Sequence, residues 1–157
     1  MIFYFIRRKK FICGLILSLA LPVYVAAKDF DVDIYIKNIK NQKGQLFIAL
    51  HNNPSAFPSN QVEAIQTTKI ILKDHQSQLN SKNELIHTFK HLSPGTYAIA
   101  CYHDENNNAK LDTFLGIPKE GYAFSNNVRP KFKAPQFKEA SFKVISQNTS
   151  LNLIMGY

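Results

Sequence analysis

Acidic and amide side chains alternate along one stretch of the chain. They occupy relative positions one, three, five and nine of a loop: Asp104, Asn106, Asn108 and Asp112. A hard cation such as calcium takes about six to eight oxygen ligands, and helical-hand calcium loops draw them from this spacing. Lys110, at position seven, would add its backbone carbonyl. The spacing therefore predicts a calcium-binding loop over residues 104–112.

Two residues depart from the usual pattern of such loops. The sixth position, where a sharp turn favours Gly, is Ala109, and the twelfth, where a bidentate Glu is usual, is Leu115. Glu120 is the next carboxylate and would fold back as a ligand. So few carboxylates predict a weak dissociation constant, on the order of 10⁻⁴ to 10⁻³ M. The alternative is a metal-free turn, because Asn and Asp side chains also bond their own backbone in turns.

The residues after this loop combine aromatic rings with hydroxyl and amide groups: Tyr122, Phe124, Ser125 and Asn126. Such a combination suits an unidentified sugar or peptide ligand. The alternative is that the two rings pack inward and the polar groups satisfy backbone atoms, since aromatics at period two commonly share a buried face.

Three ionisable residues near the loop raise the possibility of catalysis. His103 stands beside Asp104, and with Glu120 they would form the acid–base cluster of a small periplasmic hydrolase. The alternative is that His103 only ends a strand. The sequence contains no Gly-x-Ser-x-Gly, His-Glu-x-x-His or phosphate-loop motif. A non-enzymatic module is therefore favoured, and enzymatic activity stays open.

The remaining histidine and cysteine residues point to structural roles. His87 and His91 have the four-residue spacing of a helical zinc pair, but their segment is predicted to be a strand. Cys101 follows Tyr97 and Ile99 at period two, so we expect it to be a buried, small hydrophobic residue.

The N-terminus resembles a secretory signal peptide over residues 1–27. A basic segment, 7–10, precedes an apolar core from Phe11 to Leu21, and small residues end at Ala27. Cleavage there would leave residues 28–157 as a single periplasmic or secreted domain without a membrane span. An uncleaved membrane anchor is the alternative, although this segment is short for a span. The oligomeric state stays open.

The positive net charge of the chain suggests nucleic-acid binding, but part of that charge lies in the expected signal peptide. The whole chain carries a formal charge of +8, and cleavage would leave 15 basic against 11 acidic residues, or +4. No dense block of Lys and Arg remains, so nucleic-acid binding is not expected.

Short segments of period two predict an all-β fold. Phe30–Lys37 alternates clearly, and Gln45–His51 is apolar on both faces, so the two are predicted to form a hairpin with a central second strand. Further strands are predicted within 61–74, 85–92, 96–103, 138–145 and 151–155. Small Ala98 and Ala100 would let another layer approach. About seven strands predict an antiparallel β-sandwich, with a barrel as the alternative. The Leu-x-Pro-Gly-x-Tyr turn over 92–97 resembles that of prealbumin-like sandwiches, so we expect an immunoglobulin-like or prealbumin-like form.

Several motifs resemble a bacterial family of small exported proteins, the domain-of-unknown-function family 2141. The resemblance covers nearly all of 30–157 and is most specific in the segments 92–98, 103–106, 110–112, 116–122 and 124–127. Gly usually stands in that family where this chain has Ala109 and Ala123. The resemblance implies an exported bacterial protein and no established activity. We therefore expect a non-enzymatic binding or structural module with a calcium-stabilised loop.

Overall fold

The computed structural model describes residues 28–73, 84–130, 133–145 and 149–157. The expected signal peptide, 1–27, lies outside these residues. No helix in the described ranges is long and apolar enough to cross a membrane.

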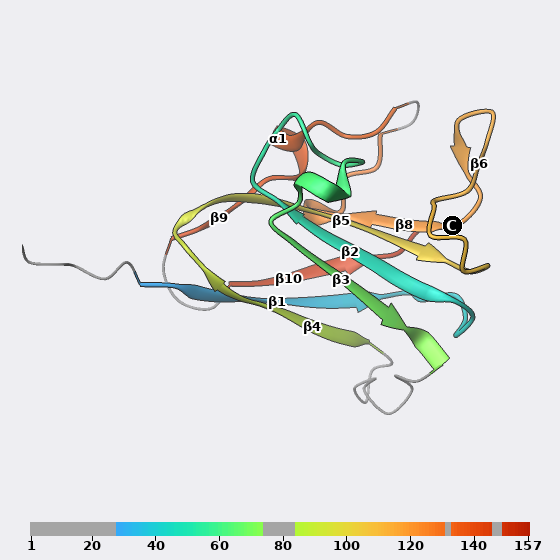
Figure 1. The fold of residues 1–157 in the computed structure, drawn as a ribbon, viewed down its shortest axis with the longest axis horizontal. Helices are drawn as coiled ribbons and strands as arrows, with labels where there is room; N and C mark the ends of the chain where they lie inside the picture. The colour runs from blue at the N-terminus through green and yellow to red at the C-terminus, as the bar shows by residue number, and fades with distance from the viewer. Residues whose placement is uncertain (1–27, 74–83, 131–132, 146–148) are drawn as a thin grey trace, which may run out of the picture.

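Ten strands occur among the described residues, and they form two facing sheets and a small separate hairpin (Figure 1). The named helical elements are short: η1 (Gln61–Glu63), η3 (Ser125–Asn127) and α1 (Phe137–Ala140). The strands are β1 (Phe30–Lys37), β2 (Gln45–His51), β3 (Gln66–Ile71), β4 (Leu85–Leu92), β5 (Gly95–Asp104), β6 (Thr113–Phe114), β7 (Ile117–Pro118), β8 (Gly121–Phe124), β9 (Phe142–Val144) and β10 (Thr149–Ile154).

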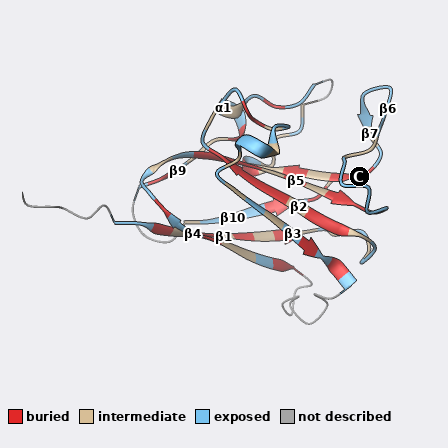
Figure 2. Ribbon diagram, viewed as in Figure 1, coloured by how far each residue is buried: buried red, intermediate tan, exposed pale blue. Residues whose placement is uncertain are grey.

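One sheet has the order β10-β1-β4. Alternate side chains of β1 point into the core, and Val32, Ile34 and Ile36 have no exposed surface, which fits the period of two in the sequence. The second sheet has the order β3-β2-β5-β8, with β9 also beside β5. Figure 2 shows buried residues concentrated in the strands of both sheets.

The all-β sandwich predicted from the sequence is confirmed, with ten strands instead of about seven. The extra strands are short pieces, because the segment after β5 contributes β6, β7 and β8. One pairing is not antiparallel, since β1 and β10 run parallel. No pairing among the described strands closes the sheets into a barrel.

The predicted hairpin of β1 and β2 is wrong. The two strands belong to different sheets: β1 pairs with β10 and β4, and β2 pairs with β3 and β5. β2 is buried along nearly its whole length because it is central in its sheet and both of its faces are covered. Its continuous apolar pattern predicted a central position correctly, but not the partner.

Two other segments differ from the predicted strands. Residues 138–140 belong to α1 because the Glu139 carboxylate accepts a hydrogen bond from the Gln136 backbone N–H at 2.6 Å, which closes a helical turn. Within 61–74, η1 precedes β3, so the segment is part helix and part strand.

A second apolar cluster covers the outer face of the second sheet. It contains Phe57, Ala98 and Ala140, so a small side chain on β5 does allow another layer to approach. His51 is fully buried beside it, with its ring centroid 5.6 Å from that of Phe57. Neither ring nitrogen of His51 has a hydrogen-bond partner among the described residues, and burial lowers its pKa.

His51 should make the protein sensitive to mild acid. Its folded-state pKa lies below the unfolded value of about 6.5, so unfolding takes up a proton below that pH. Stability is therefore full above about pH 6.5 and decreases as the pH falls toward the folded-state pKa. His87, whose pKa burial also lowers, contributes with the same sign.

We expect His51→Leu to reduce the fall in the free energy of unfolding between about pH 7 and pH 5. Urea unfolding at a series of pH values measures this slope. His91→Asn is the control, because His91 is exposed and its φ of 58° suits Asn. An unchanged slope in His51→Leu would contradict the assignment.

Candidate functional site

The 104–112 loop begins with a buried carboxylate at the end of β5. Asp104 has no exposed surface. Its Oδ1 accepts a hydrogen bond from Asn108 N (3.0 Å), and its Oδ2 accepts from Ala109 N (2.9 Å) and Gln45 Nε2 (2.7 Å). Burial raises the pKa of this carboxyl group, but the hydrogen bonds outweigh burial and hold the pKa below its usual value. Asp104 thus stays ionised and fixes the turn.

Three alternate side chains of the loop converge on one another. Asp112 Oδ2 accepts from Asn106 Nδ2 at 2.7 Å, and Asp112 Oδ1 accepts from Asn108 Nδ2 at 3.0 Å. The side-chain oxygens of the two asparagines accept backbone N–H groups of Asn108 and Lys110. The spacing read from the sequence therefore does place these polar groups on the inner side of one curled segment.

Glu120 folds back across the loop. It is nearly buried, and its two carboxylate oxygens accept the backbone N–H groups of Glu105 (2.8 Å) and Asp112 (2.9 Å). The backbone of Lys119 also donates to the carbonyl of Asp112 at 2.8 Å. Glu120 thus ties together the second and ninth positions of the loop.

The side chains of the loop and Glu120 offer mainly oxygen atoms to a bound ion. Asp104, Asp112 and Glu120 supply carboxylates, and two asparagines supply amides. Among the described residues, no three His, Cys, Asp or Glu side chains gather as a metal-binding set, so any cation here would need amide and backbone oxygens as well. Lys110 is exposed, and its backbone N–H donates to Asn108 Oδ1.

The sixth position of the loop has the backbone conformation that glycine favours. Ala109 has a φ of 62°, as does Asn107, and its carbonyl accepts a hydrogen bond from the Tyr102 hydroxyl at 3.1 Å. A left-handed conformation is costly for Ala because its Cβ approaches the following carbonyl. The sharp turn is therefore present although the glycine is not.

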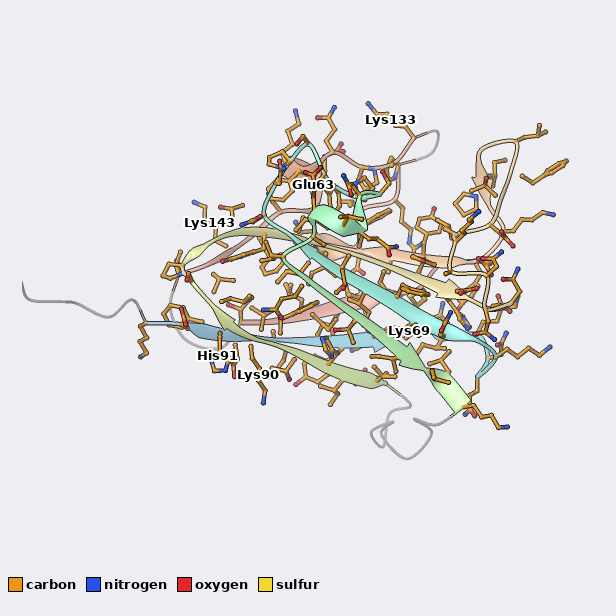
Figure 3. All side chains as sticks on the ribbon, in the orientation of Figure 1. Glu63, Lys69, Lys90, His91, Lys133 and Lys143 are labelled. Carbon is orange, nitrogen blue, oxygen red and sulfur yellow. The ribbon has the colours of Figure 1, made fainter. Side chains whose placement is uncertain are left out.

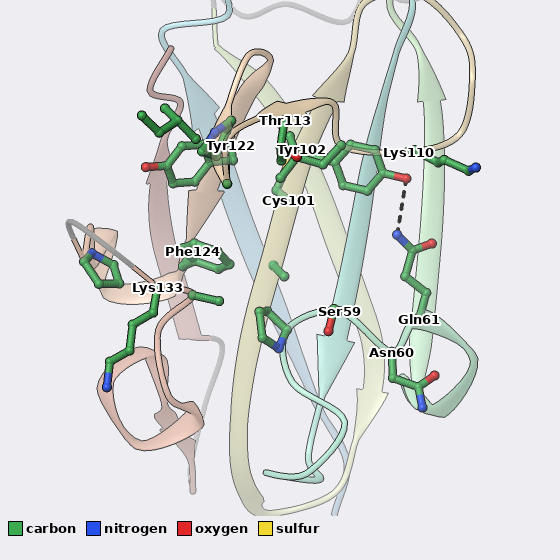
Figure 4. A pocket seen from close by; sticks show the side chains of 18 of the residues that line it. Ser59, Asn60, Gln61, Cys101, Tyr102, Lys110, Thr113, Tyr122, Phe124 and Lys133 are labelled. Carbon is green, nitrogen blue, oxygen red and sulfur yellow. Dashed lines mark hydrogen bonds between the residues drawn. The ribbon is translucent and has the colours of Figure 1, made fainter.

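A cleft of about 730 Å³ lies beside the loop, on the outer face of β5 and β8 (Figure 4). Ala109, Lys110 and Leu111 of the loop line one side of it. Tyr122 and Phe124 line its floor, and their ring centroids lie 5.7 Å apart. The loop therefore forms a wall of the cleft.

The family model described as uncharacterized protein conserved in bacteria (DUF2141) matches residues 34–152. The chain belongs to this bacterial family. No curated protein and no solved structure matches the chain. The resemblance predicted from its motifs is therefore confirmed, and it brings no established activity with it.

Two of the four predicted ligand-binding residues in this member of DUF2141 have structural contacts. The Ser125 hydroxyl is fully buried, accepts from Ile99 N at 2.8 Å and donates to Ala140 O at 2.5 Å. Asn126 Nδ2 donates to the carbonyls of Glu139 and Ser141. Both side chains hold α1 against the second sheet, whereas Tyr122 and Phe124 line the cleft.

The acid–base residues of this DUF2141 chain do not contact one another in the way the hydrolase hypothesis needs. His103 is fully buried, with Nε2 2.7 Å from Lys43 O and Nδ1 2.7 Å from the Tyr157 hydroxyl. The carboxylates of Asp104 and Glu120 are bonded to backbone N–H groups. None of the three is a free base facing the cleft.

The other candidate residues, Cys101 and the pair of His87 and His91, have structural roles. Cys101 is buried, as predicted, and burial raises the pKa of its thiol to about 12, so it is not a nucleophile at neutral pH. His87 lies in β4, with its Nε2 3.1 Å from Thr68 Oγ1. Because β4 is a strand, His87 and His91 do not share a helical face.

Sequence reasoning missed two polar residues of the site. Gln45 is the cross-strand partner of Asp104, and Gln61 Nε2 donates to the Tyr102 hydroxyl at 3.3 Å across the cleft (Figure 4). Tyr102 itself was detectable, since it alternates outward from buried Cys101. The two glutamines had no local signal, because their roles depend on segments distant in sequence.

Positive charge is spread over the surface. Lys69, Lys90 and Lys143 extend from three different strands, β3, β4 and β9 (Figure 3). At the cleft, the charged residues of its described lining are Lys110 and Lys133. The cleft therefore has a positive character with mostly apolar and aromatic walls.

Replacing Ala109 with Gly should stabilise the protein. At a φ of 62° Gly avoids the steric cost of a Cβ, and we expect a gain of about 1 kcal/mol in the free energy of unfolding. Denaturant unfolding measures it. Ala64→Gly is the control, because Ala64 has a φ of −68° and should lose stability on substitution. Equal losses in both variants would contradict the strain at Ala109.

Proposed function

We propose that this chain is an exported, non-enzymatic binding module of the bacterial periplasm or exterior. In this proposal, calcium bound by residues 104–112 fixes one wall of a ligand-binding cleft. The observation that supports it most directly is that the loop whose polar side chains converge also lines the cleft. Ordering the loop and shaping the cleft would then be one event.

The calcium part of the proposal rests on the ligand chemistry of the loop. The Asp112 carboxylate meets the amides of Asn106 and Asn108 within one curled segment, and the carboxylates of Asp104 and Glu120 accept backbone N–H groups of the same loop. The amide nitrogens of Asn106 and Asn108 now face the Asp112 carboxylate. Each amide oxygen accepts one backbone N–H group, and on binding its second lone pair would face the ion, which suits a hard cation.

The ligand part of the proposal rests on the walls of the cleft. Tyr122 and Phe124 offer ring faces on which a sugar or an apolar peptide side chain can pack. Gln61 and the Tyr102 hydroxyl offer hydrogen bonds at the opposite side. A mostly apolar cleft with a few convergent polar groups is typical of ligand sites.

The hydrolase alternative gains no support from this geometry. Its three residues, His103, Asp104 and Glu120, have their polar atoms engaged with other groups of the fold. A binding role needs no free base, so the non-enzymatic proposal is the one we carry forward.

Calcium should raise the melting temperature of the protein. A ligand at about one hundred times its dissociation constant adds about 2.7 kcal/mol, which shifts the midpoint by several degrees. We expect this shift to disappear with chelator and to fall strongly in Asp112→Asn. Terbium offers a second readout, because the Tyr102 hydroxyl lies 3.1 Å from the Ala109 carbonyl and can sensitise its luminescence.

Glu63→Gln is the matched control for charge, because Glu63 is exposed and lies outside the loop. It should retain the full calcium shift. If ten millimolar calcium leaves the melting temperature of the unmodified protein unchanged, the loop is a metal-free turn and the calcium proposal fails.

Ligand binding should depend on the cleft. Calcium-loaded protein is applied to arrays of glycans and of peptides, and the ligands retained are compared with those of chelated protein. We expect Tyr122→Ala to lose these ligands, because Tyr122 lies on the cleft floor. Tyr35→Ala, on β1 in the other sheet, should keep them. Retention of all ligands by Tyr122→Ala would place binding elsewhere.

A further inference from the structure

The β6–β7 hairpin carries a group of apolar side chains into solvent. Phe114 is 61% exposed, Leu115 87% and Ile117 69%. The hairpin has two residues in each strand and stands apart from the facing sheets in Figure 1. Contiguous exposed apolar side chains of this size mark interaction sites more often than chance.

The turn of this hairpin holds Leu115 in a backbone conformation that other residue types adopt more easily. Leu115 has a φ of 50° and Gly116 a φ of 79°, so both central residues are left-handed. Asn, Asp or Gly commonly occupies the first of these positions, because a branched apolar side chain is unfavourable there. A large apolar side chain at the exposed tip is therefore not explained by the stability of the turn.

Positive charge flanks the apolar tip. The Lys119 ammonium lies 5.3 Å from the centroid of the Phe114 ring, directly after β7. Lys110, on the adjacent loop, is also exposed. An apolar tip with flanking lysines matches a lipid interface, where rings and aliphatic groups enter the acyl boundary and ammonium groups contact anionic headgroups.

We propose that the β6–β7 hairpin docks on anionic lipid bilayers by inserting Phe114, Leu115 and Ile117, with Lys119 at the headgroups. The hairpin is narrow, whereas a stable protein interface buries about 800 Å² on each partner, so the shape favours a lipid surface over a protein. Ile117 also lines the cleft, but this inference needs neither calcium nor a cleft ligand, so it and the proposed function can fail independently.

The chain contains no tryptophan, so Phe114→Trp places one fluorescent reporter on the hairpin. Vesicles of phosphatidylglycerol and phosphatidylethanolamine are added to the purified full-length protein. We expect a blue shift of the emission and quenching by brominated acyl chains. Both effects should be weaker with phosphatidylcholine vesicles. The local reporter separates hairpin insertion from any contact made by residues 1–27.

Ile145→Trp is the matched control. Ile145 is 68% exposed, close to the value for Ile117, and it follows Val144, which pairs with Gly95 at the opposite end of β5. Its emission should not change with vesicles. Equal quenching of the two reporters would overturn the proposal, because the protein would then have no preferred docking end.

Leu115→Asn separates docking from folding. Asn tolerates the φ of 50°, so the variant should fold at least as well as the parent. In the Phe114→Trp background we expect about a tenfold loss of vesicle affinity, because one large apolar side chain no longer enters the bilayer. Lys119→Glu should weaken binding to anionic vesicles more than to phosphatidylcholine.

Two results would overturn the proposal. One is an emission spectrum of Phe114→Trp that no vesicle changes. The other is a blue shift that grows with protein concentration in the absence of lipid, which would identify a second copy of the chain as the occupant of the hairpin.

Discussion

Asp104 places a carboxylate at the buried end of β5, and such a charge is stable there only because donors surround it. One donor, Gln45, comes from the neighbouring strand β2, and the others are backbone N–H groups of the loop that Asp104 begins. The sandwich and the loop are therefore joined through one side chain. The loop conformation, the Ala109 turn and the near wall of the cleft all depend on this arrangement.

Tyr157 contacts His103, the residue that precedes the loop. Tyr157 places its hydroxyl 2.7 Å from His103 Nδ1 and 3.0 Å from the Lys40 backbone nitrogen. A Cβ at Gly121 would lie 2.4 Å from the Tyr157 ring, so a larger residue there would displace that ring. Burial raises the pKa of Tyr157 to about 12, so it stays a neutral hydroxyl at ordinary pH. His103 thus has a structural role, because its two ring nitrogens join the Lys43 carbonyl to the Tyr157 hydroxyl.

Both segments with proposed roles contain left-handed residues: Asn107 and Ala109 in the loop, and Leu115 in the hairpin, have positive φ. The facing sheets enclose the core with apolar side chains. A rigid two-sheet scaffold can hold such irregular loops because its own stability does not depend on them. The cleft and the hairpin adjoin, because Ile117 and Pro118 of β7 also line the cleft.

Local patterns in the sequence determined much of the outcome. Local apolar patterns predicted β1, β2, β4 and β5 nearly to the residue, because alternation in β1 and a continuous apolar run in β2 are properties of each strand itself. The alternating Asp and Asn side chains predicted a curled polar loop, since short polar side chains satisfy nearby backbone groups. Buried Cys101 followed from the same alternation.

Tertiary structure alone decided which strands pair and which polar groups meet. The parallel pairing of β1 with β10, the Gln45–Asp104 bond and the burial of Ser125 join segments far apart in the sequence. The β1–β2 hairpin was mispredicted for the same reason: adjacent strands can pair with each other or lie in facing sheets with the same local pattern. The choice is made by the packing of whole sheet faces, whose free energy no short stretch of sequence contains.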